Sequence, residues 1–397
     1  MPLDLFAVTQ PGLEDICAAE LAELGLPGTI VPGGVSFTSE LPGLALANLG
    51  LGVATRVLVR IGEFRAPGFP ELHAHAARLP WERYFSPTTP PRVCCIVSAR
   101  KSRLYHTVGI AERIVRGISD RLGNPAELIP AGDDDPDDSP DGAPGLAALR
   151  VHVRLERDRC TVSVDSSGDP LHRRGYRLAL ARAPLRPTLA AAMLRIAGWR
   201  PGQPLLDPMC GSGTIVIEAA RRLIGRAPGG DRSFAFLAWP GLAGPAALAQ
   251  ARIDLSQKTA INLPALSQEA PPNIVGSDRD PGAITAARAN ATRGGVLDHL
   301  SLAVRPLSAC EPPSHTPQNP GLVVCNPPYG VRVGKRGPLR DLHAQLGHVL
   351  RDRWPGAHVA LLCGDELWRH CGLPLQVARS LQNGGLPVQL VLGRVPG

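Results

Sequence analysis

The sequence predicts an α/β protein in which a doubly wound, mostly parallel sheet over residues 169–397 follows a smaller α+β region. From residue 183 onward, strand patterns alternate with helical patterns, which is typical of parallel strands joined by crossover helices. Residues 1–168 instead combine short strands with amphipathic helices, as small α+β modules do. A chain of 397 residues exceeds one ordinary hydrophobic core, so two or three domains are expected.

The α+β region is expected to hold two modules, residues 1–50 and 51–168. In the first, residues 12–21 have the apolar spacing of a helix, and residues 34–37 form a strand after a turn. Further elements are predicted in chain order: a helix at 44–50, strands at 56–61 and 93–99, a helix at 108–122, and strands at 149–155 and 160–165. At the far end of the chain, residues 387–394 predict an antiparallel edge strand.

A glycine turn between a strand and a helix is the first motif with chemical content. Residues 203–206 predict a buried strand, Gly211-Ser212-Gly213 a tight turn, and residues 214–220 the start of a helix. Glycines let the backbone approach a ligand, and a helix start presents unpaired N–H groups to an anion. The carboxylate of S-adenosylmethionine would suit this site. Nicotinamide is less favoured, because the glycine pair lacks the third glycine of a GxGxxG motif.

The next strand, residues 273–278, ends in Asp278, an acid placed to bind ribose hydroxyls. Such an acid ordinarily follows the glycine turn by about 20 residues. We therefore interpret residues 225–272, which are rich in Pro, Gly and Ala, as an insertion. Asp280 is predicted to cap the helix that begins at Pro281.

The tetrapeptide Asn326-Pro327-Pro328-Tyr329 predicts methylation of a planar exocyclic nitrogen. The amide oxygen of Asn326 and the carbonyl of Pro327 can both accept hydrogen bonds from one NH2 group, because Pro328 has no N–H to compete for them. Tyr329 offers a ring on which a flipped base could stack, an interaction worth roughly 1–3 kcal/mol. The structural alternative is a turn that merely ends a strand, since Pro-Pro often does so.

Composition indicates a protein of the reducing cytoplasm that could bind a polyanion. The net charge is +7, although six of the 35 acidic residues are packed into residues 133–141, a run expected to form a solvated loop. The remaining basic excess suits RNA, but arginine so outnumbers lysine that compositional bias is an alternative explanation. Nine cysteines without CxxC spacing indicate neither zinc nor a disulfide scaffold. No metal site, signal peptide or membrane span is expected.

Together these motifs resemble the THUMP-domain class I RNA methyltransferases, and within them the bacterial 23S rRNA guanine-N2 methyltransferases. The resemblance covers nearly the whole chain and includes residues 171–177, just before the catalytic domain, and residues 226–240 inside the insertion. It implies a Rossmann-like methyltransferase domain at 169–397, a ferredoxin-like part at 1–50 and a THUMP-like RNA-binding domain at 51–168. A second methyltransferase domain, common in bacterial relatives, is not expected.

The resemblance also implies roles for particular residues. Asn326, Pro327, Pro328 and Tyr329 would hold the target guanine, with Asn326 also close to the cofactor. The residues expected to hold S-adenosylmethionine are Asp207, Pro208, Cys210, Gly211, Ser212, Gly213, Thr214, Asp278 and Arg279. Contacts with RNA are expected from His172, Arg173, Arg174 and Tyr176, and from Lys101 and Arg103.

Three positions depart from the family pattern. Pro306 stands where an acid would bind the adenine amino group, Pro187 stands where Glu is usual, and Val331 follows the tetrapeptide where an acid is common. Methylation of guanine N2 in 23S rRNA is the leading hypothesis, and methylation of tRNA guanine N2 is the first alternative. Methylation of adenine N6 in DNA or of a protein glutamine would leave residues 1–170 without a role. A noncatalytic RNA-binding factor for ribosome assembly would accommodate the lost acids.

Overall fold

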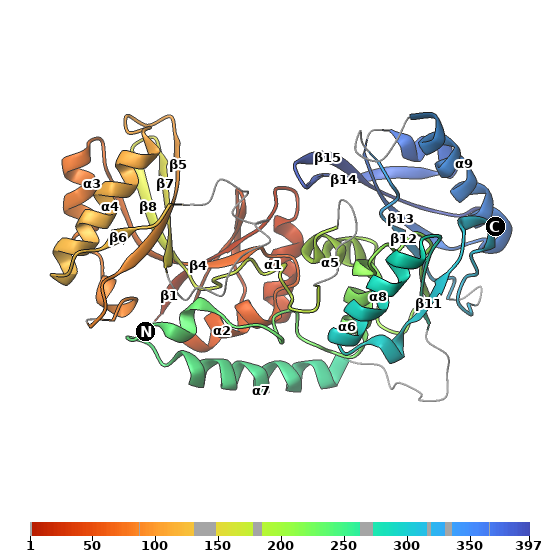
Figure 1. Cartoon of the computed structure of the whole chain (residues 1–397), viewed down its shortest axis with the longest axis horizontal. Coiled ribbons are helices and arrows are strands. Elements are labelled where there is room, and N and C mark those ends of the chain that lie inside the picture. The colour runs from red at the N-terminus through yellow and green to blue at the C-terminus, as the bar shows by residue number, and fades with distance from the viewer. Residues whose placement is uncertain are drawn as a thin grey trace. The chain divides into compact units, whose positions relative to one another are not determined.

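The computed structural model describes residues 2–86, 88–130, 148–177, 185–262, 273–315, 319–329, 336–364 and 366–397. The protein divides into two compact units. Figure 1 colours the chain from red at the N-terminus to blue at the C-terminus. Unit 1 comprises Met1–Thr9, Cys17–Leu171 and Arg232–Leu255, and unit 2 comprises Gln10–Ile16, His172–Asp231 and Ser256–Gly397. The acidic run at 133–141 and Val331 lie outside the described residues.

Unit 1 is built on one eight-stranded sheet with the strand order β2-β3-β1-β4-β8-β7-β5-β6. Strand β4, which lies beyond the expected domain boundary at residue 50, hydrogen-bonds with β1 and with β8. The strands are β1 (Leu3–Val8), β2 (Thr29–Val31), β3 (Gly34–Ser39), β4 (Arg56–Arg65), β5 (Arg92–Arg100), β6 (Glu127–Leu128), β7 (Leu149–Glu156) and β8 (Arg159–Asp165). The helices are α1 (Glu14–Glu23), α2 (Leu41–Gly50), α3 (Phe69–Ala76) and α4 (Thr107–Leu122), with a short 3-10 helix at Trp81–Arg83.

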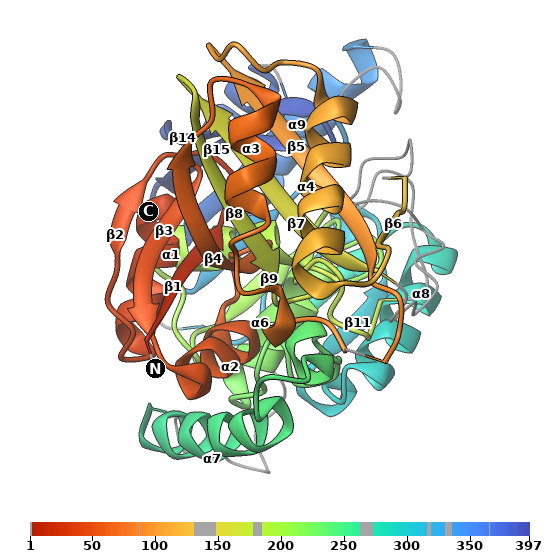
Figure 2. The same ribbon diagram turned by 90° about the vertical axis from the view of Figure 1, so that its left-hand side faces the viewer.

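Helices α3 and α4 lie side by side on one face of β5, β7 and β8 (Figures 1 and 2). Along β7, Val151 and Val153 are buried whereas Arg154 is exposed. Successive side chains of a strand point to opposite faces, so the apolar face carries the helices and the opposite face is polar. Ile110 and Ile114 of α4 are fully buried.

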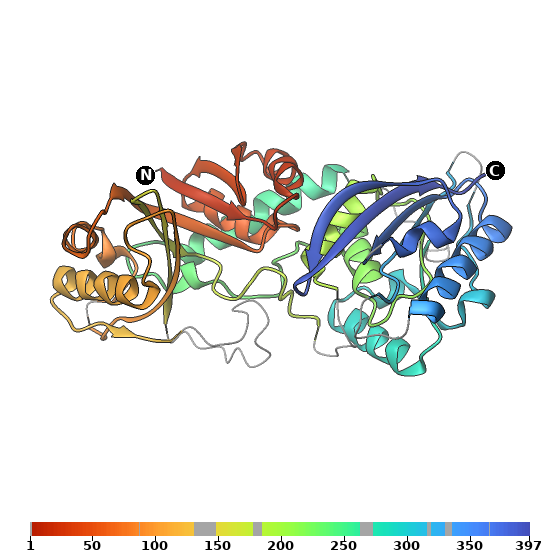
Figure 3. The same cartoon turned by 90° about the horizontal axis from the view of Figure 1, so that it is seen from above.

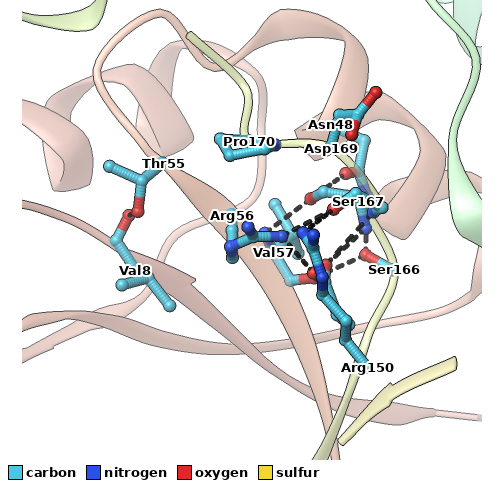
Figure 4. Close-up of polar contacts among 12 residues, drawn as sticks. Val8, Asn48, Thr55, Arg56, Val57, Arg150, Ser166, Ser167, Asp169 and Pro170 are labelled. Carbon is cyan, nitrogen blue, oxygen red and sulfur yellow. Dashed lines mark hydrogen bonds and ion pairs between the residues drawn. The ribbon is translucent and has the colours of Figure 1, made fainter. Parts of the chain in front are cut away.

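The end of unit 1 after β8 is held by a dense set of polar contacts (Figure 4). Nη1 of Arg56 and Nη1 of Arg150 both donate to the carbonyl of Gly168, over 2.6 and 2.9 Å. Ser166 donates through Oγ to the carbonyl of Val57 over 2.6 Å, and the backbone amide of Val57 donates to Oγ of Ser167 over 2.9 Å. These contacts hold the segment at a defined position beside β4.

Part of the insertion belongs to unit 1 and packs there through its aromatic and basic side chains. Arg232 donates to the carbonyls of Ser167, Asp169 and Pro170. The ring of Trp239 meets that of Tyr84 edge-on, with centroids 4.9 Å apart. The long helix α7 (Gly244–Asn262) follows a short 3-10 helix at Ala235–Ala238. These contacts all lie within unit 1. They hold the insertion in its folded position and involve no ligand.

Unit 2 is a doubly wound sheet with the strand order β11-β10-β9-β12-β13-β15-β14. Five neighbouring strands are parallel, and β15 pairs antiparallel with β13 on one side and with β14 on the other. The strands are β9 (Leu205–Asp207), β10 (Ile274–Asp278), β11 (Ser301–Val304), β12 (Leu322–Cys325), β13 (His358–Cys363), β14 (Leu375–Asn383) and β15 (Leu386–Arg394). The helices are α5 (Pro187–Ile196), α6 (Thr214–Leu223), α8 (Pro281–Arg293) and α9 (Arg336–Arg353), with short 3-10 helices at Leu297–His299, Leu307–Ala309 and Leu367–Cys371.

The last strand differs from its prediction. β15 is antiparallel as expected, but it lies between β13 and β14, so β14 is the edge strand. The two strands form the long hairpin seen in dark blue in Figure 3. The reversal at Gly384 and Gly385 uses φ angles of +55° and +78°, which glycine adopts without strain.

Both faces of the central strand β12 are buried, as a strand between two helical layers requires. Val323 belongs to an apolar cluster with Leu346 and Leu350 of α9. Leu322 and Val324 are equally buried and point to the opposite face. The ends of β9, β10 and β12 are thereby held in a rigid sheet.

Candidate active site

The glycine turn joins β9 to α6 as the sequence predicted. Gly211 and Gly213 have φ angles of +53° and +84°, in the region that favours glycine. A Cβ added at Gly213 would lie 3.0 Å from Cβ of Ala287, whereas one at Gly211 would meet nothing within 4 Å. Gly213 therefore allows the turn to pack on α8, and Gly211 borders open space. Of the other predicted turn residues, Pro208, Cys210, Ser212 and Thr214 are buried.

Asp278 closes the turn from the end of the neighbouring strand β10. Its Oδ2 accepts a 3.0 Å hydrogen bond from the amide of Gly211, and its Oδ1 accepts one of 3.0 Å from the amide of Asp280. The side chain of Asp280 accepts from the amide of Gly282 over 2.8 Å, so the predicted helix cap is confirmed. Arg279, between the two acids, is exposed.

Asp207, at the end of β9, is buried beneath the turn with 2% of its surface exposed. Its Oδ1 accepts a 3.2 Å hydrogen bond from the amide of Met209. Burial raises the pKa of Asp207 to about 7, and the negative charge of Asp278 acts in the same direction, against the hydrogen bonds from Met209 and Cys325. Asp207 is therefore placed to hold the turn.

The tetrapeptide lies at the end of β12, adjacent to the glycine turn. β9 pairs with β10 on one side and with β12 on the other, all in parallel register. The carboxyl ends of these three strands meet at one edge of the sheet, where open α/β sheets bind their ligands. Among the described residues, Oδ1 of Asn326 is buried and accepts no hydrogen bond. A buried acceptor without a donor is costly in free energy.

Tyr329 is held inside the unit with 9% of its surface exposed. Nδ2 of Asn383 donates a 2.7 Å hydrogen bond to its hydroxyl. A Cβ added at Gly364, just after β13, would lie 2.8 Å from Cδ2 of Tyr329. Neither partner was predicted, because Asn383 precedes two glycines and resembles an ordinary turn residue.

Comparison with protein families identifies this architecture. Residues 174–370 match the family model "RMKL-like, methyltransferase domain", and residues 4–58 match "RlmL ferredoxin-like domain". A relative from Synechocystis, slr0064, named as a candidate RNA methyltransferase, is 33% identical over 97% of this chain and 95% of its own length. The chain belongs to the RMKL-like methyltransferase family.

Two further relatives agree with this family. "Ribosomal RNA large subunit methyltransferase K/L" of Syntrophotalea carbinolica is 35% identical over 98% of this chain, which spans 53% of that protein's length. The solved structure of SMU.472, named as a candidate methyltransferase and bound to SAH, is 27% identical, with a TM-score of 0.81 over 100% of this chain and 98% of that one.

Members of the RMKL-like family use S-adenosylmethionine, and the glycine turn fits that cofactor. Gly211 borders open space, the N-terminal turn of α6 supplies amide donors, and Asp278 supplies a carboxylate. The third strand offers no acid, as the sequence indicated. Val304, at the end of β11, is half-exposed, and Pro306 begins the short 3-10 helix that follows.

The basic and aromatic cluster at residues 172–176 is largely buried. His172, Arg174 and Tyr176 are 6%, 1% and 1% exposed. The hydroxyl of Tyr176 donates to Oε1 of Glu218 over 2.8 Å, and Nε of Arg174 lies 3.7 Å from the same oxygen. Arg174 and Tyr176 thereby contact Glu218 of α6, and Arg173 is half-buried.

Electrostatics and further contacts support a structural role for this segment. Burial and the charges of Arg186, Arg174, Arg173 and Arg177 lower the pKa of His172 to about 3, so this imidazole is neutral. Nε of Arg293 on α8 donates to the carbonyl of Tyr176 over 2.9 Å. The segment is thereby attached to both helices that flank the glycine turn.

Lys101 and Arg103 lie at one end of the unit 1 sheet and are exposed, as an RNA contact requires. Sequence reasoning missed their neighbours. Tyr105 is 80% exposed, and Arg157 in the β7–β8 turn is also exposed. The amide of Arg103 donates to Oδ1 of Asp158 over 2.7 Å, which joins the two loops. A shallow pocket beside them is lined by Phe64, Arg65, Glu156, Arg157 and Arg159.

The nine cysteines, all of which the structure describes, form no disulfide. Over the described ranges, no group of His, Cys, Asp or Glu side chains is arranged to bind a metal ion. In the same ranges, no helix is long and apolar enough to cross a membrane.

Proposed function

We propose that this protein transfers a methyl group from S-adenosylmethionine to the exocyclic N2 of a guanine in 23S rRNA. The observation that carries the proposal is the buried Oδ1 of Asn326, which accepts no hydrogen bond among the described residues. It lies at the carboxyl end of β12, one strand away from the glycine turn. An amino group directed there would be close to a cofactor bound at the turn.

The proposed chemistry depends on orientation. Oδ1 of Asn326 and the carbonyl of Pro327 would accept hydrogen bonds from the two N–H groups of guanine N2 and reduce the delocalisation of its lone pair into the ring. When bound, S-adenosylmethionine supplies a methyl group on a sulfonium leaving group. N2 would accept that methyl group while the carbon–sulfur bonding pair stays on sulfur, and N2 would then release one proton to water. Positioning supplies most of the acceleration, so no strong base is required.

The remaining predicted residues have supporting roles in this proposal. Gly211, Gly213 and the amides at the start of α6 would receive the cofactor carboxylate, and Asp278 the ribose hydroxyls. Tyr329 would offer its ring to the base. Arg279 would contribute a cofactor contact from the exposed side of the same turn.

RNA binding is assigned to the exposed basic end of unit 1. Lys101, Arg103 and Arg157 would contact phosphates, and Tyr105 would stack on a base. Arg173, in unit 2, is proposed as a separate RNA contact. The choice of ribosomal RNA is supported by the Syntrophotalea relative, whose name specifies large-subunit rRNA. This chain spans about half the length of that relative. Ribosomal RNA is therefore a proposed substrate of this chain.

A competition assay tests the substrate. Unmodified 23S rRNA, tRNA and DNA are incubated together with the enzyme and S-adenosylmethionine labelled in the methyl group. Label in 23S rRNA alone supports the proposal, and label in tRNA favours the tRNA alternative. Cofactor binding without label in any nucleic acid favours a noncatalytic assembly factor, the alternative raised by Pro187 and Pro306.

A further inference from the structure

The hydroxyl of Tyr329 is held by a residue that lies 54 positions later in the chain. Nδ2 of Asn383 donates to this hydroxyl over 2.7 Å, and the two residues are 8% and 9% exposed. Asn383 is the last residue of β14 and pairs with Leu386 across the hairpin. The hairpin thereby fixes the position of the Asn383 side-chain amide.

The ring of Tyr329 is confined at a second point. A Cβ added at Gly364 would lie 2.8 Å from Cδ2, 3.2 Å from Cγ and 3.3 Å from Cβ of Tyr329. The absence of a side chain at Gly364 therefore makes room for this ring. With its flank against Gly364 and its hydroxyl on Asn383, the ring is restrained near its base and at its tip.

The amide of Asn383 has little else to orient it. Its Oδ1 is buried and accepts no hydrogen bond from any described residue. The contact with Tyr329 is therefore the interaction that compensates the burial of this side chain, since a buried amide needs a partner. Removing the hydroxyl of Tyr329 should release Asn383, and removing Asn383 should release the ring.

We infer that Asn383 is a positioning residue for methyl transfer: it holds the ring of Tyr329 in the orientation against which the acceptor base is placed. The inference rests on the proposed function, because Tyr329 belongs to the tetrapeptide that receives the base. Asn383 acts on the substrate through Tyr329. A ring free to pivot would leave the acceptor nitrogen off the line of attack, and a misplacement of about 1 Å can cost on the order of 100-fold in rate.

A kinetic double-mutant cycle tests the inference. Asn383→Leu keeps the approximate size and removes the donor, and Tyr329→Phe removes only the hydroxyl. Each is expected to lower kcat about 10- to 100-fold with an unchanged KM for S-adenosylmethionine, and the double variant should lose no more than either single one. Gln382→Leu, at the exposed neighbouring position, is the control and should retain the wild-type kcat. Wild-type kcat in Asn383→Leu, or losses that multiply in the double variant, would overturn the inference.

A spectroscopic measurement separates this inference from the proposed function. The chain has only four tyrosines, so 13C labelling at tyrosine Cζ gives few signals, and Tyr329→Phe identifies the one of interest. That signal should shift in Asn383→Leu and stay in place in Gln382→Leu. If it shifts while the wild type methylates no RNA, the proposed function has failed and the Asn383–Tyr329 contact stands. An unmoved signal in an active enzyme rejects the inference alone.

Discussion

The backbone amide of Gly211 donates a 3.0 Å hydrogen bond to Oδ2 of Asp278, which links the turn after β9 to the end of β10. The acid proposed to bind the ribose therefore also shapes the turn proposed to bind the carboxylate. Because Oδ1 of Asp278 accepts from the amide of Asp280, both carboxylate oxygens already have backbone donors. Ribose hydroxyls would use the remaining lone pairs.

Asp278→Ala should weaken S-adenosylmethionine binding by at least 10-fold. The change removes the ribose acceptor and leaves the amide of Gly211 without its partner, and a hydrogen bond to a charged group is worth about 1.5–3 kcal/mol. Equilibrium dialysis with labelled cofactor measures the effect. Asp280→Ala, which removes a helix cap, serves as the comparison and should leave affinity nearly unchanged. Unaltered affinity in Asp278→Ala would show that this carboxylate does not bind the cofactor.

Asn326→Ala should abolish methyl transfer and leave cofactor binding nearly intact. The substitution removes the buried Oδ1 that is proposed to accept from the substrate amino group, while the glycine turn is untouched. Single-turnover transfer is measured together with equilibrium dialysis on the same preparation. Transfer at the wild-type rate would remove Asn326 from the mechanism.

Tyr176→Phe should destabilise the protein without changing its affinity for RNA. It leaves the buried carboxylate of Glu218 without the 2.8 Å hydroxyl donor, a loss of about 1–3 kcal/mol in the free energy of unfolding. Urea unfolding measures the stability, and filter binding measures RNA affinity. A fall in RNA affinity at unchanged stability would restore the RNA contact first predicted for Tyr176.

Arg157→Ala should weaken RNA binding and reduce its dependence on salt. Arg157 is exposed in the turn beside Lys101 and Arg103, and each lost phosphate contact lowers the slope of log affinity against log salt by about 1. Binding is titrated at several salt concentrations. Arg92→Ala is the control, because Arg92 lies at the opposite end of β5 and pairs with Glu127. Equal effects of the two substitutions would contradict a localised RNA site.

Asp207 should contribute a loss of stability as the pH rises from about 4 to about 7, whereas His172, whose pKa is lowered to about 3, acts in the opposite direction. The folded-state pKa of Asp207, about 7, lies above the ordinary value of 3.8, so the folded state binds more protons at this carboxyl over this interval. The contribution of Asp207 to the unfolding free energy therefore falls with rising pH, by a few kcal/mol at about 1.4 kcal/mol per pKa unit. Urea unfolding at several pH values should show that the unfolding free energy of the wild type falls with rising pH relative to that of Asp207→Asn. Identical profiles would contradict the shifted pKa.

Local patterns predicted most of unit 2 because the site residues follow short, buried parallel strands. The glycine turn, Asp278 and Asn326 occur at strand ends in the sequence and meet at one sheet edge in the structure. The position of β15 between β13 and β14 could not be derived in this way, because it depends on pairing with both of these strands.

Burial of the charged cluster was also beyond local reasoning. Arg174 and Tyr176 resemble a solvated RNA contact until Glu218, 42 residues after Tyr176, is placed against them. Asn383 was missed for the same reason, since its partner Tyr329 is distant in sequence. Long-range polar pairs of this kind leave no periodic signal.

Identification of the methylated atom tests the central claim most directly. After single-turnover reaction with unmodified 23S rRNA and labelled S-adenosylmethionine, the RNA is digested to nucleosides and the labelled product is identified by mass spectrometry. The proposed orientation of an exocyclic amine by Asn326 predicts N2-methylguanosine as the labelled nucleoside, absent from the reaction of Asn326→Ala. Label on a ring carbon or a ribose hydroxyl would contradict it.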